Sequence, residues 1–127
     1  MPCQFTYENQ AATIVQINEA GDFALVEPLL DLNKACDATE CCLFFKITNP
    51  FQFQRLILTK INAFLVSEGS LTPTPVSNVE PRRITLEPES TDLVEVTLET
   101  WMDQDTIFLE LIGSTECLRR EEILEKL

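Results

Sequence analysis

The sequence contains no histidine among its 127 residues. Histidine is the usual general base, the usual activator of serine and cysteine nucleophiles, and the commonest transition-metal ligand. Its absence excludes many classes of enzyme. Carboxylate pairs could still act as acid and base, but no cluster of acidic residues in this sequence marks a deep cleft. We therefore predict a protein that is not an enzyme and that carries no cofactor.

Positive charge and glycine are also scarce. Nine lysine and arginine residues stand against 21 aspartate and glutamate residues, which gives a formal net charge of -12 at pH 7. This charge repels nucleic acid and anionic membranes, and it favours basic protein surfaces. With three glycines, the chain has no Gly-rich phosphate-binding loop. We predict protein partners, in a homo-oligomer or among the subunits of a capsid or other assembly, with no nucleic acid and no membrane.

Long apolar runs are missing as well. The opening segment MPCQFTYENQAATIVQ has neither the charged start nor the uninterrupted apolar stretch of a secretory signal. No run elsewhere is long enough to cross a bilayer. We therefore expect a protein that is not secreted through a signal peptide and that lies in the cytoplasm or in a virion.

The cysteine count is odd, with Cys3, Cys36, Cys41, Cys42 and Cys117. Without an export signal, the first expectation is free thiols in a reducing compartment. A disulfide such as Cys36 to Cys42 and a zinc site that adds Cys117 are the alternatives. The spacing of these cysteines does not suit a zinc site, because the adjacent Cys41 and Cys42 would point to opposite faces of a strand.

Short alternating runs predict about seven β-strands. Residues 13–17 and 23–26 form one expected hairpin around the turn at 19–22. Residues 41–48 place Cys41, Leu43, Phe45 and Ile47 on one face, and Asn49-Pro50 ends that strand. Residues 92–102 and 106–113 form a second expected hairpin, closed by the turn at 103–105. Residues 69–79, with two prolines, are expected to form a long exposed loop.

Residues 55–66 are apolar on both alternating faces. Either a bulge switches the strand from one face to the other, or the strand is buried on both sides, for example by a partner chain. The sequence leaves both alternatives open.

The last segment, residues 114–127, changes to a helical period. Ser114 is a suitable N-cap, Lys126 lies in the last turn, and Cys117, Leu124 and Leu127 share one face. A helix this short is marginal alone, so we expect it to dock on the rest of the domain or on a neighbouring chain.

Together these elements predict an all-β protein, an antiparallel sandwich with a short C-terminal helix. The runs FFKITNPFQFQRLILTKINAFLV and RRITLEPESTDLVEVTLET resemble immunoglobulin-like sandwiches over residues 41–112. The chain lacks the Cys-Trp-Cys arrangement of antibody domains, since Trp101 lies late in the sequence. The resemblance implies the fold only. We divide the chain into an N-terminal arm or edge segment (1–12), a sandwich domain (13–113) and the helix (114–127).

Apolar side chains on expected outer faces, at loop tips and on the terminal helix carry the functional hypothesis. The candidate interface residues are Phe44, Phe51, Phe53, Phe64, Trp101, Phe108, Leu124 and Leu127. They favour a structural or interaction protein in an assembly, of the kind that decorates or cements virus capsids. The alternative is a ligand-binding or metal-binding module. It would use the Cys36–Cys42 region, or the turn at Asp103–Asp105 as a calcium site.

Overall fold

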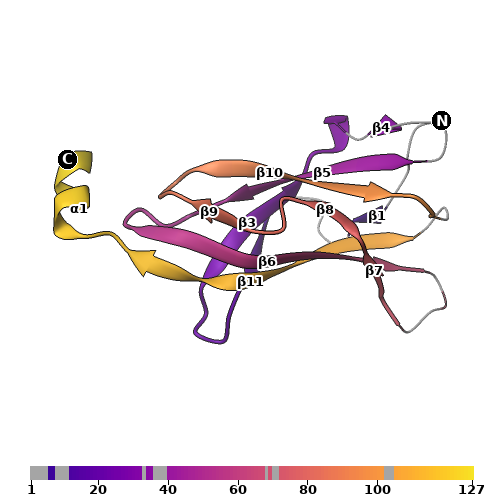
Figure 1. The fold of residues 1–127 in the computed structure, drawn as a ribbon, viewed down its shortest axis with the longest axis horizontal. Coiled ribbons are helices and arrows are strands. Elements are labelled where there is room, and N and C mark those ends of the chain that lie inside the picture. Colours follow the sequence, from indigo (N-terminus) through magenta and orange to yellow (C-terminus); the bar gives the residue numbers. More distant parts are fainter. Residues whose placement is uncertain are drawn as a thin grey trace.

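The computed structural model describes residues 6–7, 12–32, 34–35, 40–67, 69, 72–101 and 105–127, which form two β-sheets and one short α-helix (Figure 1). The first sheet, called the β6 sheet, contains β1 (Thr6–Tyr7), β11 (Thr106–Cys117), β6 (Gln54–Val66), β7 (Thr74–Val76) and β9 (Ile84–Leu86). The second, called the β5 sheet, contains β2 (Thr13–Gln16), β3 (Phe23–Pro28), β4 (Lys34–Ala35), β5 (Cys41–Thr48), β10 (Thr91–Leu98) and β8 (Asn78–Glu80). A 3-10 turn, η1 (Leu30–Leu32), follows β3, and α1 (Arg120–Lys126) follows β11.

The strand order is β1-β11-β6-β7 in the β6 sheet and β2-β3-β5-β10-β8 in the β5 sheet. In addition, β9 pairs with β6 and β4 pairs with β5. Among the described residues, every pairing is antiparallel except that of β1 with β11. The all-β prediction is confirmed, and so is the first hairpin, which β2 and β3 form.

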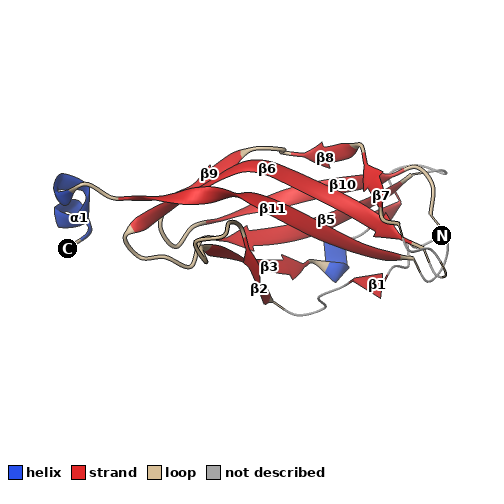
Figure 2. Cartoon of the chain, turned by 90° about the horizontal axis from the view of Figure 1, so that it is seen from below, coloured by secondary structure: helices blue, strands red, loops and turns tan. Residues whose placement is uncertain are grey.

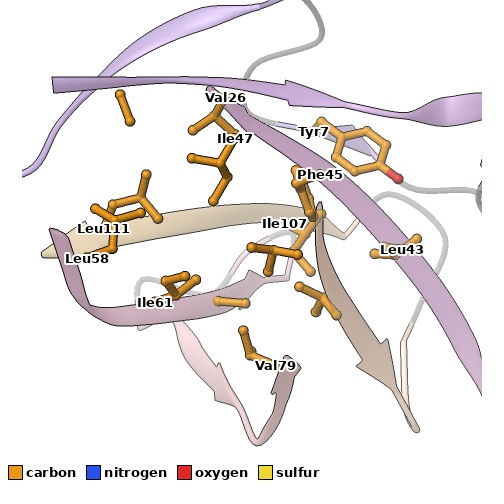
Figure 3. Close-up of a cluster of buried hydrophobic side chains, with 14 of the residues drawn as sticks. Tyr7, Val26, Leu43, Phe45, Ile47, Leu58, Ile61, Val79, Ile107 and Leu111 are labelled. Atoms are coloured by element: carbon orange, nitrogen blue, oxygen red, sulfur yellow. The ribbon is translucent and has the colours of Figure 1, made fainter. Parts of the chain in front are cut away.

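The core lies between the two sheets and is filled by alternate side chains of the long strands (Figure 3). The alternation of residues 41–48 and 94–98 predicted these inner faces, because successive side chains of a strand point to opposite sides. The central buried side chains are Leu43, Phe45, Ile47, Leu56, Leu58, Ile61, Val94, Val96, Ile107 and Leu111. Tyr7 of β1 adds an edge-to-face ring contact with Phe45, with ring centroids 5.4 Å apart.

A β-bulge in β6 settles the question of its two apolar faces. The buried side chains of this strand are Leu56 and Leu58, then Ile61 and Ala63. Between them the register with β11 shifts at Ile112 and Gly113, which leaves Thr59 as an extra residue. The Thr59 hydroxyl donates to the Ile112 carbonyl at 3.1 Å. The strand therefore changes face at the bulge, as the first alternative predicted.

The predicted hairpin of residues 92–113 is wrong. β10 pairs with β5 and β8, whereas β11 pairs with β6 and β1 in the other sheet. Each strand has one buried face, and this pattern is the same whether two consecutive strands share a sheet or face each other across a core. The segment expected to be an open loop, residues 69–79, likewise contains β7 and the start of β8.

The predicted C-terminal helix is present but begins later than expected. Ser114 is not its N-cap, because residues 114–117 continue β11 and pair with β6. Arg119 takes the cap position, and its backbone N–H donates to the Glu122 side chain at 3.2 Å. Tertiary pairing with a long neighbouring strand outweighs the local preference of a serine for a helix start.

Candidate functional site

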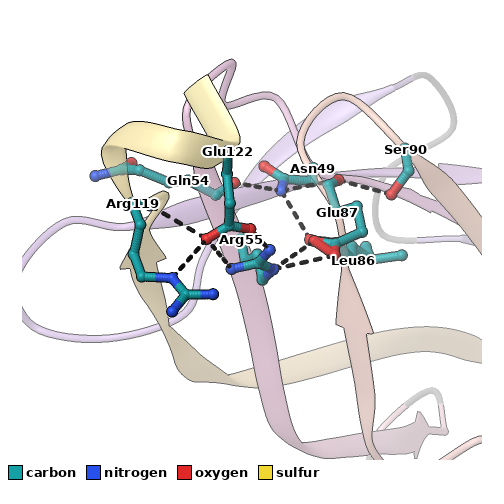
Figure 4. A network of polar contacts seen from close by, with 8 residues as sticks. All are labelled: Asn49, Gln54, Arg55, Leu86, Glu87, Ser90, Arg119 and Glu122. Atoms are coloured by element: carbon teal, nitrogen blue, oxygen red, sulfur yellow. Dashed lines mark hydrogen bonds and ion pairs between the residues drawn. The ribbon is translucent and has the colours of Figure 1, made fainter. Parts of the chain in front are cut away.

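Arg55 of β6 holds α1 in place at one end of the molecule (Figure 4). Its guanidinium forms an ion pair with Glu122 of α1, and a second one with Glu87 in which Nε lies 2.7 Å from Oε2. The side chains of Arg55 and Glu122 are 22% and 21% exposed, so solvent screens this pair less than a fully exposed one. Arg119 adds a weaker contact to Glu122 at 3.4 Å.

Asn49 supports the turn that leads into β6 and hence the position of Arg55. This residue is fully buried, and its side-chain amide nitrogen lies 2.8–3.1 Å from the carbonyl oxygens of Gln54, Leu86 and Glu87 (Figure 4). Its side-chain oxygen accepts from the Phe51 N–H at 2.9 Å. The donor and acceptor groups of this buried side-chain amide all have hydrogen-bond partners. These hydrogen bonds hold the Asn49-Pro50 turn in one conformation.

The helix that this network positions buries none of its own residues. Leu124 is 57% exposed and Leu127 is 90% exposed. Figures 1 and 2 both show α1 at one end of the molecule, beyond the end of β11 and away from the sheet faces. The helix contacts the sandwich through the ion pair of Glu122 with Arg55, whereas Leu124 and Leu127 stay exposed. Docking of this helix on a neighbouring chain stays a prediction.

The structure brings two of the other candidate interface residues into contact. Phe64 of β6 and Phe108 of β11 are directly opposite in the register, and their rings stack with centroids 5.3 Å apart. Both lie on the outer face of the β6 sheet and are half-buried. Aromatic pairs of this kind contribute about 0.5–1.5 kcal/mol beyond their buried area.

The remaining candidates are spread over the molecule. Phe44 is half-buried on the outer face of the β5 sheet, opposite Glu95. Phe51 packs against the core and against the ring of Phe23, whereas Phe53 is 38% exposed. Trp101 also packs against the core. Of these residues, Phe53 lies beside the segment that leads into α1, because the Leu118 N–H donates to its carbonyl at 2.9 Å.

The cysteines depart from the first expectation. Cys41 and Cys42 are both disulfide-bonded, so the prediction of free thiols is wrong for them. Cys117 is a free, exposed thiol. Cys3 and Cys36 lie outside the described residues. Because a zinc site needs thiolates, Cys41 and Cys42 cannot serve as its ligands in this state. Disulfides persist mainly in oxidising environments, so a reducing compartment no longer follows from the cysteine count.

The acidic turn offers no metal site in the part of the chain that the structure describes. Asp105 is buried and interacts with the chain around it, and Asp103 lies outside the described residues. Among the described residues, no group of three or more cysteine or acidic side chains could hold a metal ion. Nor does any helix in those residues have the length and apolar character to cross a membrane.

Comparison with known proteins finds no family model that matches the chain, no similar curated protein and no solved structure with significant similarity.

Sequence reasoning identified Leu124 and Leu127 but missed the residues that position them. Arg55 and Glu122 are 67 residues apart in the chain, and no local pattern links two charges at that distance. Asn49 was interpreted only as a turn residue before proline. Its burial, and the three carbonyl groups around it, depend on segments that meet only in the folded chain.

Proposed function

We propose that the protein is a non-enzymatic structural subunit that assembles with copies of itself, and that its body is an immunoglobulin-like sandwich. The observation that carries the proposal is α1, a helix held by ion pairs that leaves Leu124 and Leu127 in solvent. A helix of seven residues gains little from its own hydrogen bonds, so an exposed apolar face is best explained by a partner that covers it.

The energetics support this use of the helix. Burying one leucine side chain stabilises a complex by about 1.5–3 kcal/mol. Because Arg55 and Glu122 already fix the helix on the end of β6, association does not have to order it first. A surface that is rigid before binding loses less conformational entropy when it binds.

Within this class we propose an accessory role in a virus particle, such as capsid decoration. The support is indirect: the chain is small and strongly acidic, and Cys41 and Cys42 are disulfide-bonded. Disulfides persist on virion surfaces and in other oxidising settings, and strong net charge keeps a released subunit soluble. The immunoglobulin-like arrangement is supported by two packed sheets whose long strands β5 and β10 face β6 and β11.

The test compares the solution mass of three proteins by light scattering. We expect the wild type to exceed the 14.4 kDa chain mass at high concentration. Replacing both exposed leucines, Leu124→Ser with Leu127→Ser, should raise the dissociation constant at least about tenfold, since each step of 1.4 kcal/mol is tenfold. A matched double variant of the same helix, Glu121→Gln with Glu125→Gln, should associate like the wild type. A wild type that stays monomeric at every concentration contradicts the proposal.

A further inference from the structure

The exposed face of α1 carries positive charge as well as apolar side chains. Arg120, Leu124 and Leu127 are spaced by four and then three residues, which places them on one face of a helix. All three are exposed, and Arg120 forms no ion pair with any described residue. Glu122, which holds the helix on the sandwich, lies on the opposite face. The surface that α1 presents to solvent is therefore apolar and cationic, in a chain with a net charge of -12.

A surface hollow, which we call the β7–β10 hollow, lies at the other end of the molecule. It forms where β7 and the end of β10 come together, and its apolar lining consists of Leu65, Pro75, Val76 and Leu98. Figures 1 and 2 both show β7 at the end of the molecule opposite to α1. A hollow at this end cannot receive the helix of its own chain, but it is open to the helix of another copy.

Carboxylates surround the β7–β10 hollow. Glu99 lines it and is exposed. A second hollow, which shares part of its lining, adds the acidic residues Glu40, Glu80 and Glu95. Against these four carboxylates, the two linings contain one cationic side chain, that of Arg82. Glu80 and Glu95 are directly opposite in the pairing of β8 with β10, so a cation from outside the chain would reduce the repulsion between them.

The exposed face of α1 and the β7–β10 hollow are complementary. The apolar lining of the hollow can remove Leu124 and Leu127 from water, and the surrounding carboxylates attract the charge of Arg120. Two copies with a net charge of -12 repel each other, so a contact between them is favoured where one side is cationic. The exposed face of α1 provides that cationic side.

We propose that α1 of one copy docks in the β7–β10 hollow of the next copy, so that the subunits associate head to tail. Such a contact joins two different surfaces of the same chain. Its repetition forms a closed ring when the rotation between subunits closes, and an open chain of subunits when it does not. The inference rests on the proposed function and identifies the surface that covers Leu124 and Leu127.

Charge reversal at the hollow tests the contact without changing α1. The hollow variant combines Glu80→Lys with Glu99→Lys, at two exposed positions. We expect its dissociation constant to rise at least about tenfold, because lysine side chains then face Arg120. Arg120→Glu, on the other side of the contact, should weaken association to a similar extent. Circular dichroism checks the fold of each variant, and Glu19→Lys with Glu110→Lys, which line neither hollow, should associate like the wild type.

A mixture of two variants distinguishes a head-to-tail contact from a symmetric one. The leucine variant of α1 keeps its hollow and the hollow variant keeps its helix, so one contact can form between them. At a concentration where each variant alone is monomeric, an equimolar mixture should form a 1:1 dimer of twice 14.4 kDa and nothing larger. Mixing would not restore a symmetric contact between two α1 helices.

A hollow variant that associates like the wild type, or a mixture that stays monomeric, overturns this inference. If the leucine variant is weakened in the same experiment, the proposed function stands and only the assignment of the hollow is wrong. A wild type that is monomeric at every concentration overturns both.

Discussion

Arg55, at the start of the long strand β6, and Glu122, in the helix α1, are 67 residues apart in the chain and form an ion pair. The pair places the exposed Leu124 at a defined position beyond the end of the sandwich. Without it, the seven residues of α1 would have little to hold them in helical form. The apolar surface proposed for assembly therefore depends on the contacts of Glu122 with Arg55 and with Arg119.

Replacing Glu122 by glutamine should loosen α1 without unfolding the sandwich. The variant loses the ion pair to Arg55 and weakens the contact with the Arg119 N–H. We expect a loss of about 0.5–1 kcal/mol in the free energy of unfolding, and faster amide exchange at residues 120–126. Hydrogen exchange with urea denaturation measures both. Glu121→Gln, one position away and exposed, is the control, and equal effects of the two substitutions would argue against the role of the ion pair.

Gly113→Ala should destabilise the whole domain. A Cβ at this position would lie 2.1 Å from the Ile57 carbonyl oxygen, so the backbone of the bulge must move. Overpacking of this kind costs about 1–3 kcal/mol. The free energy of unfolding in urea measures the loss, with Ser114→Ala at the exposed neighbouring position as the control. A change below about 0.5 kcal/mol, the usual range for surface substitutions, would show that the bulge is adaptable.

Asn49→Asp should be more damaging still, although it changes a single group. The side-chain amide nitrogen near the carbonyl groups of Gln54, Leu86 and Glu87 becomes an oxygen that cannot donate when ionised. An uncompensated buried charge costs about 3–5 kcal/mol. Thermal and urea unfolding at pH 7 test this, with Asn78→Asp at an exposed site for comparison. Similar stability of the two variants would contradict the claim that the hydrogen bonds of the buried Asn49 side chain stabilise this turn.

The state of the cysteines can be read by alkylation followed by peptide mass mapping. In denaturant without reductant, Cys117 should be labelled, whereas Cys41 and Cys42 should stay protected until a reductant is added. The denaturant matters because both disulfide-bonded residues are buried in the native chain. Labelling of Cys41 or Cys42 before reduction would show that the bonds are absent.

Side-chain alternation predicted the inner faces of β5 and β10, because a strand of period two with one apolar face can bury only that face. It could not show that β10 and β11 lie in different sheets. A strand has the same alternation of apolar and polar residues whichever of the two sheets it belongs to. Ser114 was misassigned for a related reason: its pairing with Ile57 is a contact between distant segments. Of the candidate site, Leu124 and Leu127 followed from the helical period, while Arg55 could not be inferred from any local pattern.

The most direct measurement is the molar mass of the wild-type protein in solution, taken by light scattering over a concentration series. A subunit that assembles with its own copies should show a mass that rises above 14.4 kDa towards a whole-number multiple as concentration increases. A constant mass of 14.4 kDa at every concentration would contradict self-assembly through α1.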